Sequence, residues 1–121
     1  MTVGAKNDLV IALDYYDGEV EGFARCGGEC SYFMRLCVDD DDINEYVSIS
    51  IECLLFDEIV DLLRYDGISV KVLVYSGSND DLNKRLDELV PELRLQLQLA
   101  GRRLNGHSYL KAAKTNPRKV V

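Results

Sequence analysis

Four cysteines are the most chemically distinctive side chains of this sequence. Cys26 and Cys30 lie on either side of a Gly-Gly pair, and Cys37 and Cys53 follow at wider spacing. Zinc sites often use two cysteines two to four residues apart on a turn, and four thiolates complete a tetrahedron. The four residues could therefore bind zinc, or the Cys26 and Cys30 pair could be redox-active.

The turn between the first two cysteines argues against both kinds of site. A tight hairpin at Gly27-Gly28 places Cys26 opposite Glu29 and Cys30 opposite Arg25, so the two thiols do not face each other. Their neighbours are mostly apolar, and free cysteine commonly packs as a small core hydrophobe. Because we find no export signal, we expect all four thiols to be reduced and metal-free.

The carboxylates and the single histidine give little support for catalysis. Residues 39–42 are four aspartates without the glycine that a calcium loop needs for its sharp turn, so we expect a solvated loop. His107 has no nucleophile beside it, which excludes most Ser-His and Cys-His arrangements. We expect no catalytic residue and no cofactor. The alternative is a small enzyme that uses carboxylates or the Cys26 and Cys30 pair.

Tyrosines at predicted turns and strand ends are the candidates for binding. Tyrosine and acidic residues together on a surface are typical of protein-binding patches, where the ring supplies contact area at low entropic cost. The alternative is that these rings cap the core. The predicted binding residues are Tyr15, Tyr16, Asp17, Tyr32 and Tyr46.

Charge is strongly divided along the 121 residues. The net charge is −7, but residues 1–92 hold 7 Lys/Arg and all 21 Asp/Glu, whereas residues 93–121 hold the other 7 Lys/Arg and no acid. The acidic part repels nucleic-acid phosphates and anionic membranes, so we expect neither as a partner. The basic end could attract them or pair with its own body. No apolar run is long enough for a membrane span and no signal peptide is evident, so we expect a cytoplasmic location.

The apolar pattern predicts an α+β fold that opens with a four-stranded antiparallel meander. The predicted strands span residues 9–13, 19–26, 31–38 and 46–51. From Cys53 the period becomes helical, and Gly67 is the predicted C-cap of this helix. Residues 68–75 form a predicted fifth strand, and Ser78 is the predicted N-cap of a last helix.

Leucines spaced three and four residues apart predict that this last helix spans residues 82–104. Pro91 lies inside it, removes a backbone donor, and is expected to kink the helix or split it. The strict alternation of residues 93–99 would also suit a strand, but Leu, Arg and Gln favour a helix. We assign residues 1–106 to a single domain and residues 107–121 to a basic, flexible tail.

The length of this helix also predicts a homodimer. Six turns measure about 35 Å, whereas a five-stranded sheet is about 20 Å wide. The second half would expose an apolar patch of a kind that monomers rarely show, so we expect a second copy to cover it across a two-fold axis. The alternative is that the proline folds this half back onto the same sheet. The predicted dimer interface comprises Leu93, Leu95, Leu97, Leu99 and Leu104.

The beginning of the chain resembles that of a set of small, uncharacterised bacterial proteins. The resemblance rests on the Asp-Tyr-Tyr-Asp-Gly segment at 14–18, followed by Gly22, Gly27-Gly28 and Tyr32-Phe33. It covers about 20 of 121 residues, and Glu19 stands where a proline is expected. It implies a β-meander and a bacterial origin, and it implies no activity.

Two classes of function are compatible with these patterns. The first is a small acidic protein-binding module, in the manner of adaptors or toxin-neutralising immunity proteins, without catalytic activity. The second is a small enzyme or a metal-binding protein. A concave pocket that contains titratable groups with perturbed pKa values favours the enzyme, and a flat acidic-aromatic face or a large symmetric interface favours binding. We expect the binding module, with a protein as its partner.

Overall fold

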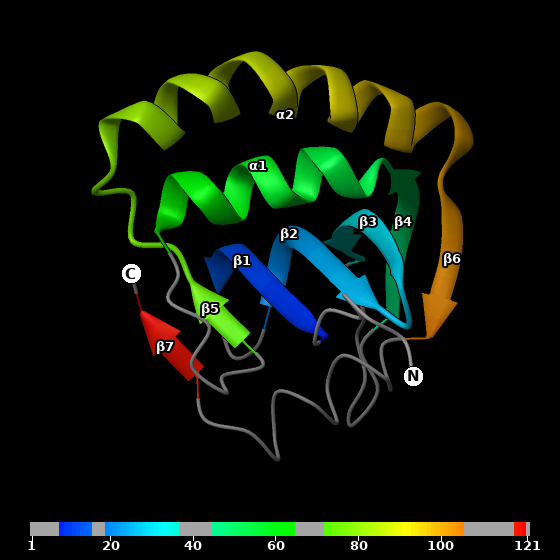
Figure 1. Ribbon diagram of the computed structural model, residues 1–121. Coiled ribbons are helices and arrows are strands. Elements are labelled where there is room, and N and C mark those ends of the chain that lie inside the picture. Colours follow the sequence, from blue (N-terminus) through cyan, green and yellow to red (C-terminus); the bar gives the residue numbers. More distant parts are fainter. Residues whose placement is uncertain (1–7, 16–18, 37–44, 65–71, 106–117, 121) are drawn as a thin grey trace.

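Seven strands in one sheet and two helices make up the part of the chain that the computed structural model describes, residues 8–15, 19–36, 45–64, 72–105 and 118–120. The strand order is β6-β4-β3-β2-β1-β5-β7, and both helices lie on one face of the sheet (Figure 1). The predicted α+β class is therefore confirmed.

The first four strands form the predicted antiparallel meander. They are β1 (Leu9–Tyr15), β2 (Glu19–Cys26), β3 (Glu29–Arg35) and β4 (Glu45–Ile51). Each is paired with the next in sequence order. Short turns between alternating apolar runs produce this arrangement, because sequential strands then pair as hairpins.

A glycine turn sets the register between β2 and β3. Gly27 and Gly28 have φ angles of 60° and 83°, a region that residues with a Cβ rarely adopt. The turn places Arg25 opposite Cys30, as the sequence predicted. Side chains alternate along a strand, so this register decides which β3 residues face the helices.

Three further strands extend the sheet at its two edges. β5 (Val72–Val74) pairs in parallel with β1, and β7 (Arg118–Val120) pairs in parallel with β5. At the other edge β6 (Arg102–Asn105) pairs antiparallel with β4. Residues 118–120 of the predicted flexible tail therefore belong to the sheet, and residues 106–117, with His107, lie outside the described residues.

The two helices lie side by side on the sheet. They are α1 (Cys53–Leu63) and α2 (Asp80–Ala100). The cap of α2 is Asn79 rather than the predicted Ser78, because the Asn79 side chain accepts a hydrogen bond from the backbone nitrogen of Leu82 at 2.9 Å. α1 ends at a left-handed Arg64, before the predicted glycine cap.

Pro91 bends α2 without breaking it. The helix is continuous over 21 residues and is bowed over the sheet in Figure 1. Proline cannot donate to the carbonyl of Asp87, four residues earlier, so the helix loses one hydrogen bond on this side. Pro91 is exposed, and the loss falls where water can replace the donor. The helix ends at Ala100, and Leu104 belongs to β6.

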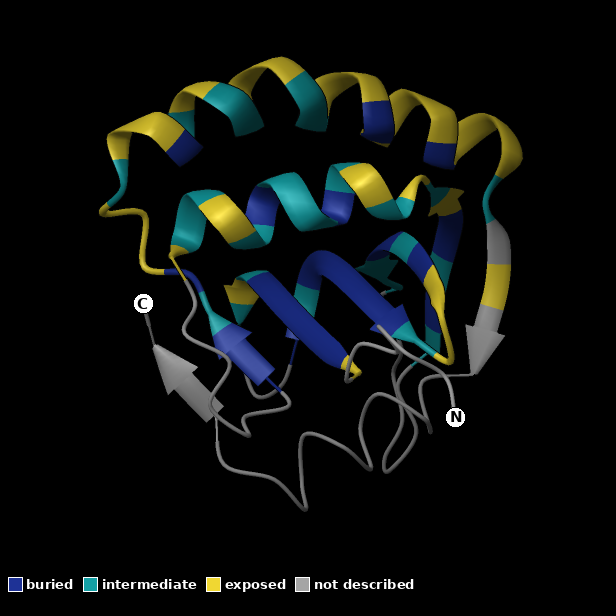
Figure 2. Cartoon of the chain, in the orientation of Figure 1, coloured by how far each residue is buried: buried dark blue, intermediate teal, exposed yellow. Residues whose placement is uncertain are grey.

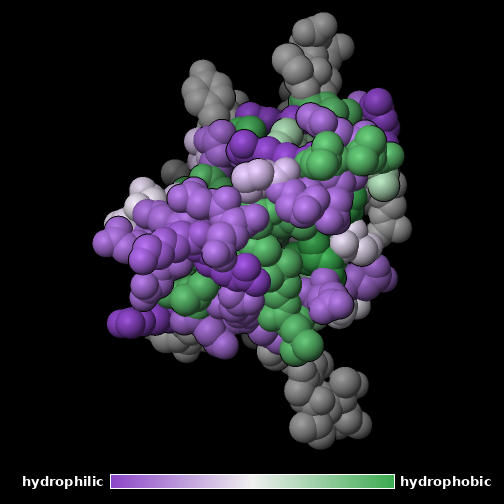
Figure 3. All heavy atoms as spheres, turned by 90° about the horizontal axis from the view of Figure 1, so that it is seen from above, coloured by the Kyte–Doolittle hydropathy of each residue, from purple (hydrophilic) through white to green (hydrophobic). Residues whose placement is uncertain are grey.

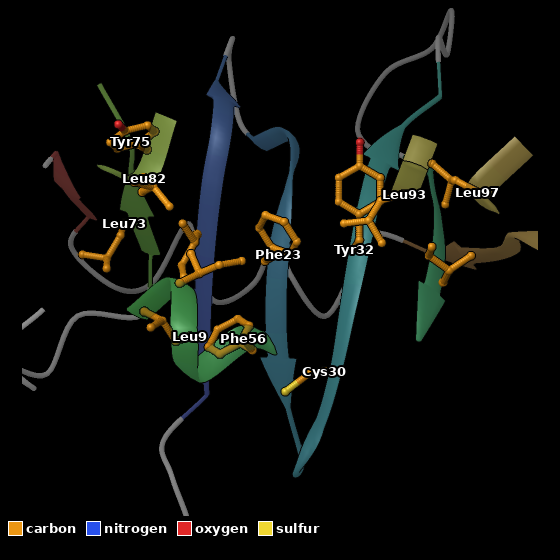
Figure 4. Packing of buried hydrophobic residues seen from close by; sticks show 13 residues of the cluster. Leu9, Phe23, Cys30, Tyr32, Phe56, Leu73, Tyr75, Leu82, Leu93 and Leu97 are labelled. Atoms are coloured by element: carbon orange, nitrogen blue, oxygen red, sulfur yellow. The ribbon is translucent and has the colours of Figure 1, made fainter. Parts of the chain in front are cut away.

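A hydrophobic core fills the space between the sheet and the helices. Phe23 and Tyr32 lie on the helix-facing side of neighbouring strands with ring centroids 5.5 Å apart, and Phe56 of α1 packs over the same side (Figure 4). Figure 2 shows the buried positions of both helices turned towards the sheet. The Arg25 guanidinium lies 4.6 Å from the Phe56 ring centroid and pairs with Asp57, which ties α1 to β2.

A second apolar cluster occupies the opposite face of the sheet. Phe33 and Tyr46 are fully buried there and meet edge to face at 5.4 Å. Val10, Ala24 and Val72 complete this cluster. Both faces of the central strands are therefore buried, which explains why β1 reads as a continuous apolar run rather than an alternating one.

The burial of the leucines of α2 requires a correction to the predicted dimer interface. Leu93 and Leu97 are each only 6% exposed and pack in the core of their own chain, whereas Leu95 and Leu99 are 51% and 79% exposed. A helix of 21 residues measures about 31 Å, and a seven-stranded sheet is about 29 Å wide. The helix therefore finds enough sheet to cover, because β6 and β7 widen the sheet beyond the predicted five strands.

The burial of α2 predicts a contrast between two neighbouring leucines. Leu93→Ala removes a core side chain and should lower the free energy of unfolding by about 2 to 5 kcal/mol. Leu95→Ala changes a half-exposed side chain and should cost under about 1 kcal/mol. Urea denaturation of the two variants measures the difference. Equal losses would contradict the described orientation of the helix.

Candidate functional site

A buried carboxylate on β2 joins the sheet to α2. Glu21 accepts hydrogen bonds from Arg94, from Nε at 3.0 Å and from Nη2 at 2.8 Å. The fully buried Tyr32 of β3 donates its hydroxyl hydrogen to the same carboxylate. Bidentate arginine–carboxylate pairs are among the stronger hydrogen-bonded pairs in proteins. The network of Glu21, Tyr32 and Arg94 thus fastens three elements together.

The network is arranged to hold protons rather than to transfer them. Burial, and then the hydrogen bond to Glu21, raise the pKa of Tyr32 far above its usual range. Hydrogen bonds to Glu21 and Tyr32 likewise raise the pKa of Arg94. Both groups therefore stay protonated at neutral pH. An acid–base catalyst needs a pKa near the working pH, so neither side chain is suited to that role.

A groove runs beside α2 and ends at this network. The part around Glu21 and Arg94 has a volume of about 400 Å³, and an adjoining part around Tyr75 has about 470 Å³. The two parts share Leu13 and Leu86, which are half-buried. The groove is therefore continuous, and its lining mixes apolar side chains with polar and charged ones.

The topology explains why the groove lies here. β1 and β5 are parallel, so their carboxyl ends meet at one edge of the sheet, where β2 begins. Figure 4 shows the hydroxyl groups of Tyr32 and Tyr75 at this end of the sheet. The helical residues that line the groove recur at three- and four-residue spacing, from Asn83 through Leu86 and Val90 to Arg94. One side of α2 therefore forms the wall of the groove.

Tyr75 closes the groove at the start of α2. Its hydroxyl donates to Oδ1 of Asn83 at 2.6 Å and accepts from the backbone nitrogen of Asn79 at 3.0 Å. The Asn83 side chain also donates to the carbonyl of Gly77 at 2.9 Å. The Tyr75 hydroxyl and the Asn83 side chain are therefore already hydrogen-bonded within the protein, and these bonds fix the shape of this end of the groove.

Two carboxylates in the groove are not used in this way. Asp14 at the end of β1 and Asp87 on α2 are both exposed. Within the described part of the chain, no hydrogen bond or ion pair engages either side chain. The Asp87 carbonyl has also lost its helical donor at Pro91. The groove therefore contains two negatively charged carboxylates that accept no hydrogen bond from the described residues.

A second buried carboxylate lies at the start of β2. Glu19 is fully buried, and no other residue of the described part of the chain donates a hydrogen bond to its carboxylate oxygens. Burial raises the pKa of Glu19, against the smaller lowering effects of a backbone hydrogen bond and of Arg35. The Tyr46 hydroxyl donates to the Glu19 carbonyl at 3.1 Å. Glu19 thus favours its protonated form more in the folded chain than in the unfolded one.

The predicted tyrosine residues do not form a common exposed patch. Tyr32 and Tyr46 are both fully buried, and they lie on opposite faces of the sheet, in two separate clusters. Tyr15 is half-buried at the end of β1, and Tyr16 and Asp17 lie outside the described residues. The alternative interpretation, that these rings fill the core, is the correct one for Tyr32 and Tyr46.

The expectation of four reduced thiols is wrong for two of them. Cys30 and Cys53 form a disulfide with their Cα atoms 5.3 Å apart, well within the normal range. The β2–β3 register turns Cys30 towards the helices, where the first residue of α1 meets it. Cys26 is half-buried near the apolar cluster of the other face. Cys37 lies outside the described residues, and among those described no three His, Cys, Asp or Glu gather as metal ligands.

The outward side of the helices is acidic and carries isolated apolar side chains. α1 contains three acidic residues and no basic one, and α2 contains five acidic and three basic residues. Leu54, Leu95 and Leu99 are exposed on these helices. Figure 3 shows this side of the molecule as hydrophilic with interspersed hydrophobic patches. We call this surface the helical face.

Comparison with protein-family models, with curated proteins and with solved structures found no match to this chain. None of the described helices has the length and apolarity needed to cross a membrane. The geometry of the groove and of the helical face is therefore the basis for a functional proposal.

Sequence reasoning did not find the residues that form the groove. Glu21 and Arg94 are 73 positions apart, and no local motif connects them. Asp14 and Asp87 each look like an ordinary surface acid in the sequence. One usable signal was Pro91, because a proline inside a helix marks a carbonyl without a donor.

Replacing Tyr32 should change how stability responds to alkaline pH. In the unfolded chain tyrosine ionises near pH 10, whereas the folded protein keeps Tyr32 neutral because its pKa is raised. The contribution of Tyr32 to the free energy of unfolding is therefore complete below about pH 10. It is lost as the pH rises, because ionisation then favours the unfolded chain. Above this pH the loss is about 1.4 kcal/mol per pH unit. In the Tyr32→Phe variant the free energy of unfolding should fall less steeply with pH above about pH 10, because the ionisable hydroxyl is gone. Urea denaturation from pH 7 to 11.5 measures it, and parallel curves above pH 10 would refute the account.

The disulfide should contribute measurably to stability. Its cysteines are 23 positions apart, and closing a loop of this size stabilises a fold by about 3 kcal/mol in the chain-entropy description. Adding dithiothreitol should lower the free energy of unfolding of the wild type by this amount. The Cys30→Ser/Cys53→Ser double variant should not respond to the reductant. A wild type that is equally indifferent to reductant would contradict the disulfide.

Proposed function

We propose that the chain is a small acidic protein-binding module without catalytic activity, which occupies a basic surface on a partner protein through its helical face. The observation that carries this proposal is the exposed, acidic surface of α1 and α2 with its isolated leucines. Adaptors and toxin-neutralising immunity proteins act through surfaces of this kind.

The charge of the helical face supports a basic partner. The helices together hold eight acidic and three basic residues. Two of the three basic residues are already committed, Arg85 to Glu58 and Arg94 to Glu21. The outward field is therefore dominated by carboxylates. Such a field accelerates association with a positive surface and suppresses binding to nucleic acids and anionic lipids.

The exposed leucines support a protein rather than a small ion as the ligand. Leu54 is 78% exposed, and Leu99 is 79% exposed. Protein interfaces combine an apolar centre with a polar rim, and the helical face provides both kinds of side chain. Scattered apolar residues are normal on monomers, so the combination with the acidic field carries the weight of the proposal.

The enzyme alternative has weaker support. The groove and the buried network beside it do contain titratable groups with perturbed pKa values, but the pKa values of Arg94 and Tyr32 move away from neutrality. Catalytic acids and bases are usually tuned towards the working pH. The network formed by these residues and Glu21 is better suited to holding α2 in place.

Self-association and location stay predictions. Of the predicted dimer residues, Leu95 and Leu99 are available at the surface, so any dimer would have to use them in place of Leu93 and Leu97. The Cys30–Cys53 disulfide bears on the compartment, because disulfides persist in oxidising environments and are rare in the reduced cytosol. The redox state of this pair in cells therefore tests the predicted cytoplasmic location.

A binding experiment with matched charge reversals tests the proposal. The full chain captures partners from a lysate of its source cells at low salt, and the affinity of each purified partner is then measured by calorimetry. Glu92→Lys on the helical face should weaken binding at least about tenfold. Raising the salt concentration should weaken the wild-type complex as well.

Glu29→Lys provides the control. This change has the same effect on net charge, but Glu29 is exposed in the β2–β3 hairpin and belongs to neither helix. Its complex should keep nearly wild-type affinity. Equal weakening by both variants would mean that only net charge matters and would refute a role of the helical face. Failure to capture any basic partner would count against the module itself.

A further inference from the structure

The groove beside α2 has the lining that a long cationic side chain requires. Its lining includes the half-buried apolar side chains of Leu13, Leu86 and Val90. Its walls present the carboxylates of Asp14 and Asp87, which no described residue engages. Lysine and arginine have an apolar stem and a charged end, so they match a groove whose lining combines apolar side chains with carboxylates.

The charges that belong to the fold cancel within the groove. Arg94 forms two hydrogen bonds with Glu21, so this pair adds no net charge to the lining. The pair is intramolecular and also engages Tyr32, which makes it a poor target for displacement by a ligand. Asp14 and Asp87 therefore leave the groove with a net charge of about −2. Anionic ligands are disfavoured and cations are attracted.

The number and kind of acceptors favour a guanidinium group. A guanidinium has five N–H donors in a planar fork and binds carboxylates in pairs of hydrogen bonds, whereas an ammonium is a compact point charge. The groove supplies two carboxylates, those of Asp14 and Asp87, and can therefore accept several of these donors. A bare metal ion has less support, since the described residues hold no group of three potential ligands of the His, Cys, Asp and Glu type.

We propose that this groove binds an arginine side chain presented by the partner protein, with the guanidinium paired to Asp14 and Asp87 and the stem against Leu13, Leu86 and Val90. This inference rests on the proposed function, because it names the group that a basic partner would present. It assigns the groove as the anchor site and the helical face as the surrounding contact. Anchor residues of this type, buried in a pocket and ringed by weaker contacts, commonly dominate interface energetics.

A short peptide tests the groove without the partner. The ¹⁵N-labelled full chain is titrated with Ac-Gly-Arg-Gly-NH₂ and, in parallel, with the same peptide carrying neutral citrulline. The arginine peptide should give saturable shifts of the amide signals around Asp14 and Asp87, and the citrulline peptide should not. Absence of saturable shifts, or equal shifts with both peptides, would overturn the proposal.

Matched amide substitutions locate the site. Asp14→Asn and Asp87→Asn each remove one carboxylate of the groove and should weaken the arginine peptide at least fivefold. Asp81→Asn removes an exposed carboxylate in the first turn of α2, outside the groove lining, and should leave its affinity unchanged. Equal weakening in all three variants would indicate general electrostatic attraction and would overturn the assignment.

Two further outcomes separate this inference from the proposed function and from an internal ligand. A captured partner whose affinity is unaffected by Asp14→Asn and Asp87→Asn would overturn the groove assignment and leave the binding function standing. Saturable arginine binding in the groove, without any protein partner, would support the groove and count against the binding function. Tighter peptide binding after Lys111→Gln and Lys114→Gln would show that the chain's own basic segment fills the groove, and it would overturn the assignment to a partner.

Discussion

A carboxylate at the boundary between a sheet and a helix must replace the water that it loses on folding. Glu21 does so with the two donors of Arg94 and the hydroxyl of Tyr32. This contact fixes the position of α2 along its own axis. It also fixes the rotation of α2 about that axis, because Arg94 can reach Glu21 only from one side of the helix. Leu93 and Leu97 then turn into the core, and Pro91 turns outward. The position of the helix thus follows from one polar contact together with the leucine stripe.

The groove is a consequence of the same constraint. The side of α2 that carries Leu86, Val90 and Arg94 lies beside the carboxyl end of β1, which runs parallel to β5, rather than over the flat surface of the strand. Strand ends cannot pack as closely as a pleated face, so space remains beside the helix. The side chains around this space come from β1, β2 and α2, and they bring Asp14 and Asp87 together with the apolar Leu13 and Leu86. The Glu21–Arg94 pair that fixes α2 therefore also forms part of the lining of the groove.

Local patterns predicted the elements well, and long-range contacts escaped them. Strict alternation and a Gly-Gly turn are enough to predict the meander and its Arg25–Cys30 register. The Cys30–Cys53 disulfide depends on where α1 lands on the sheet, which spacing alone does not encode. The same holds for β6 and β7, whose residues have no alternating pattern and become strands by pairing with exposed sheet edges. The width that they add is what removes the reason for a dimer through Leu93.

The division of charge along the sequence gains a physical meaning in the fold. Two basic residues of the C-terminal part pair with acids of the body, Arg94 with Glu21 and Arg103 with Glu45 at 2.8 Å. These pairs differ in kind, because Glu21 is buried whereas the Arg103 pair is largely exposed and contributes little to stability. Each nevertheless neutralises an acid at the sheet. Of the eight acids of α1 and α2, Asp57, Glu58 and Glu88 are paired with Arg25 or Arg85, and the other five form no ion pair within the described residues. Folding therefore concentrates the uncompensated negative charge on the helices and in the groove beside them, the two places where a basic partner would find it.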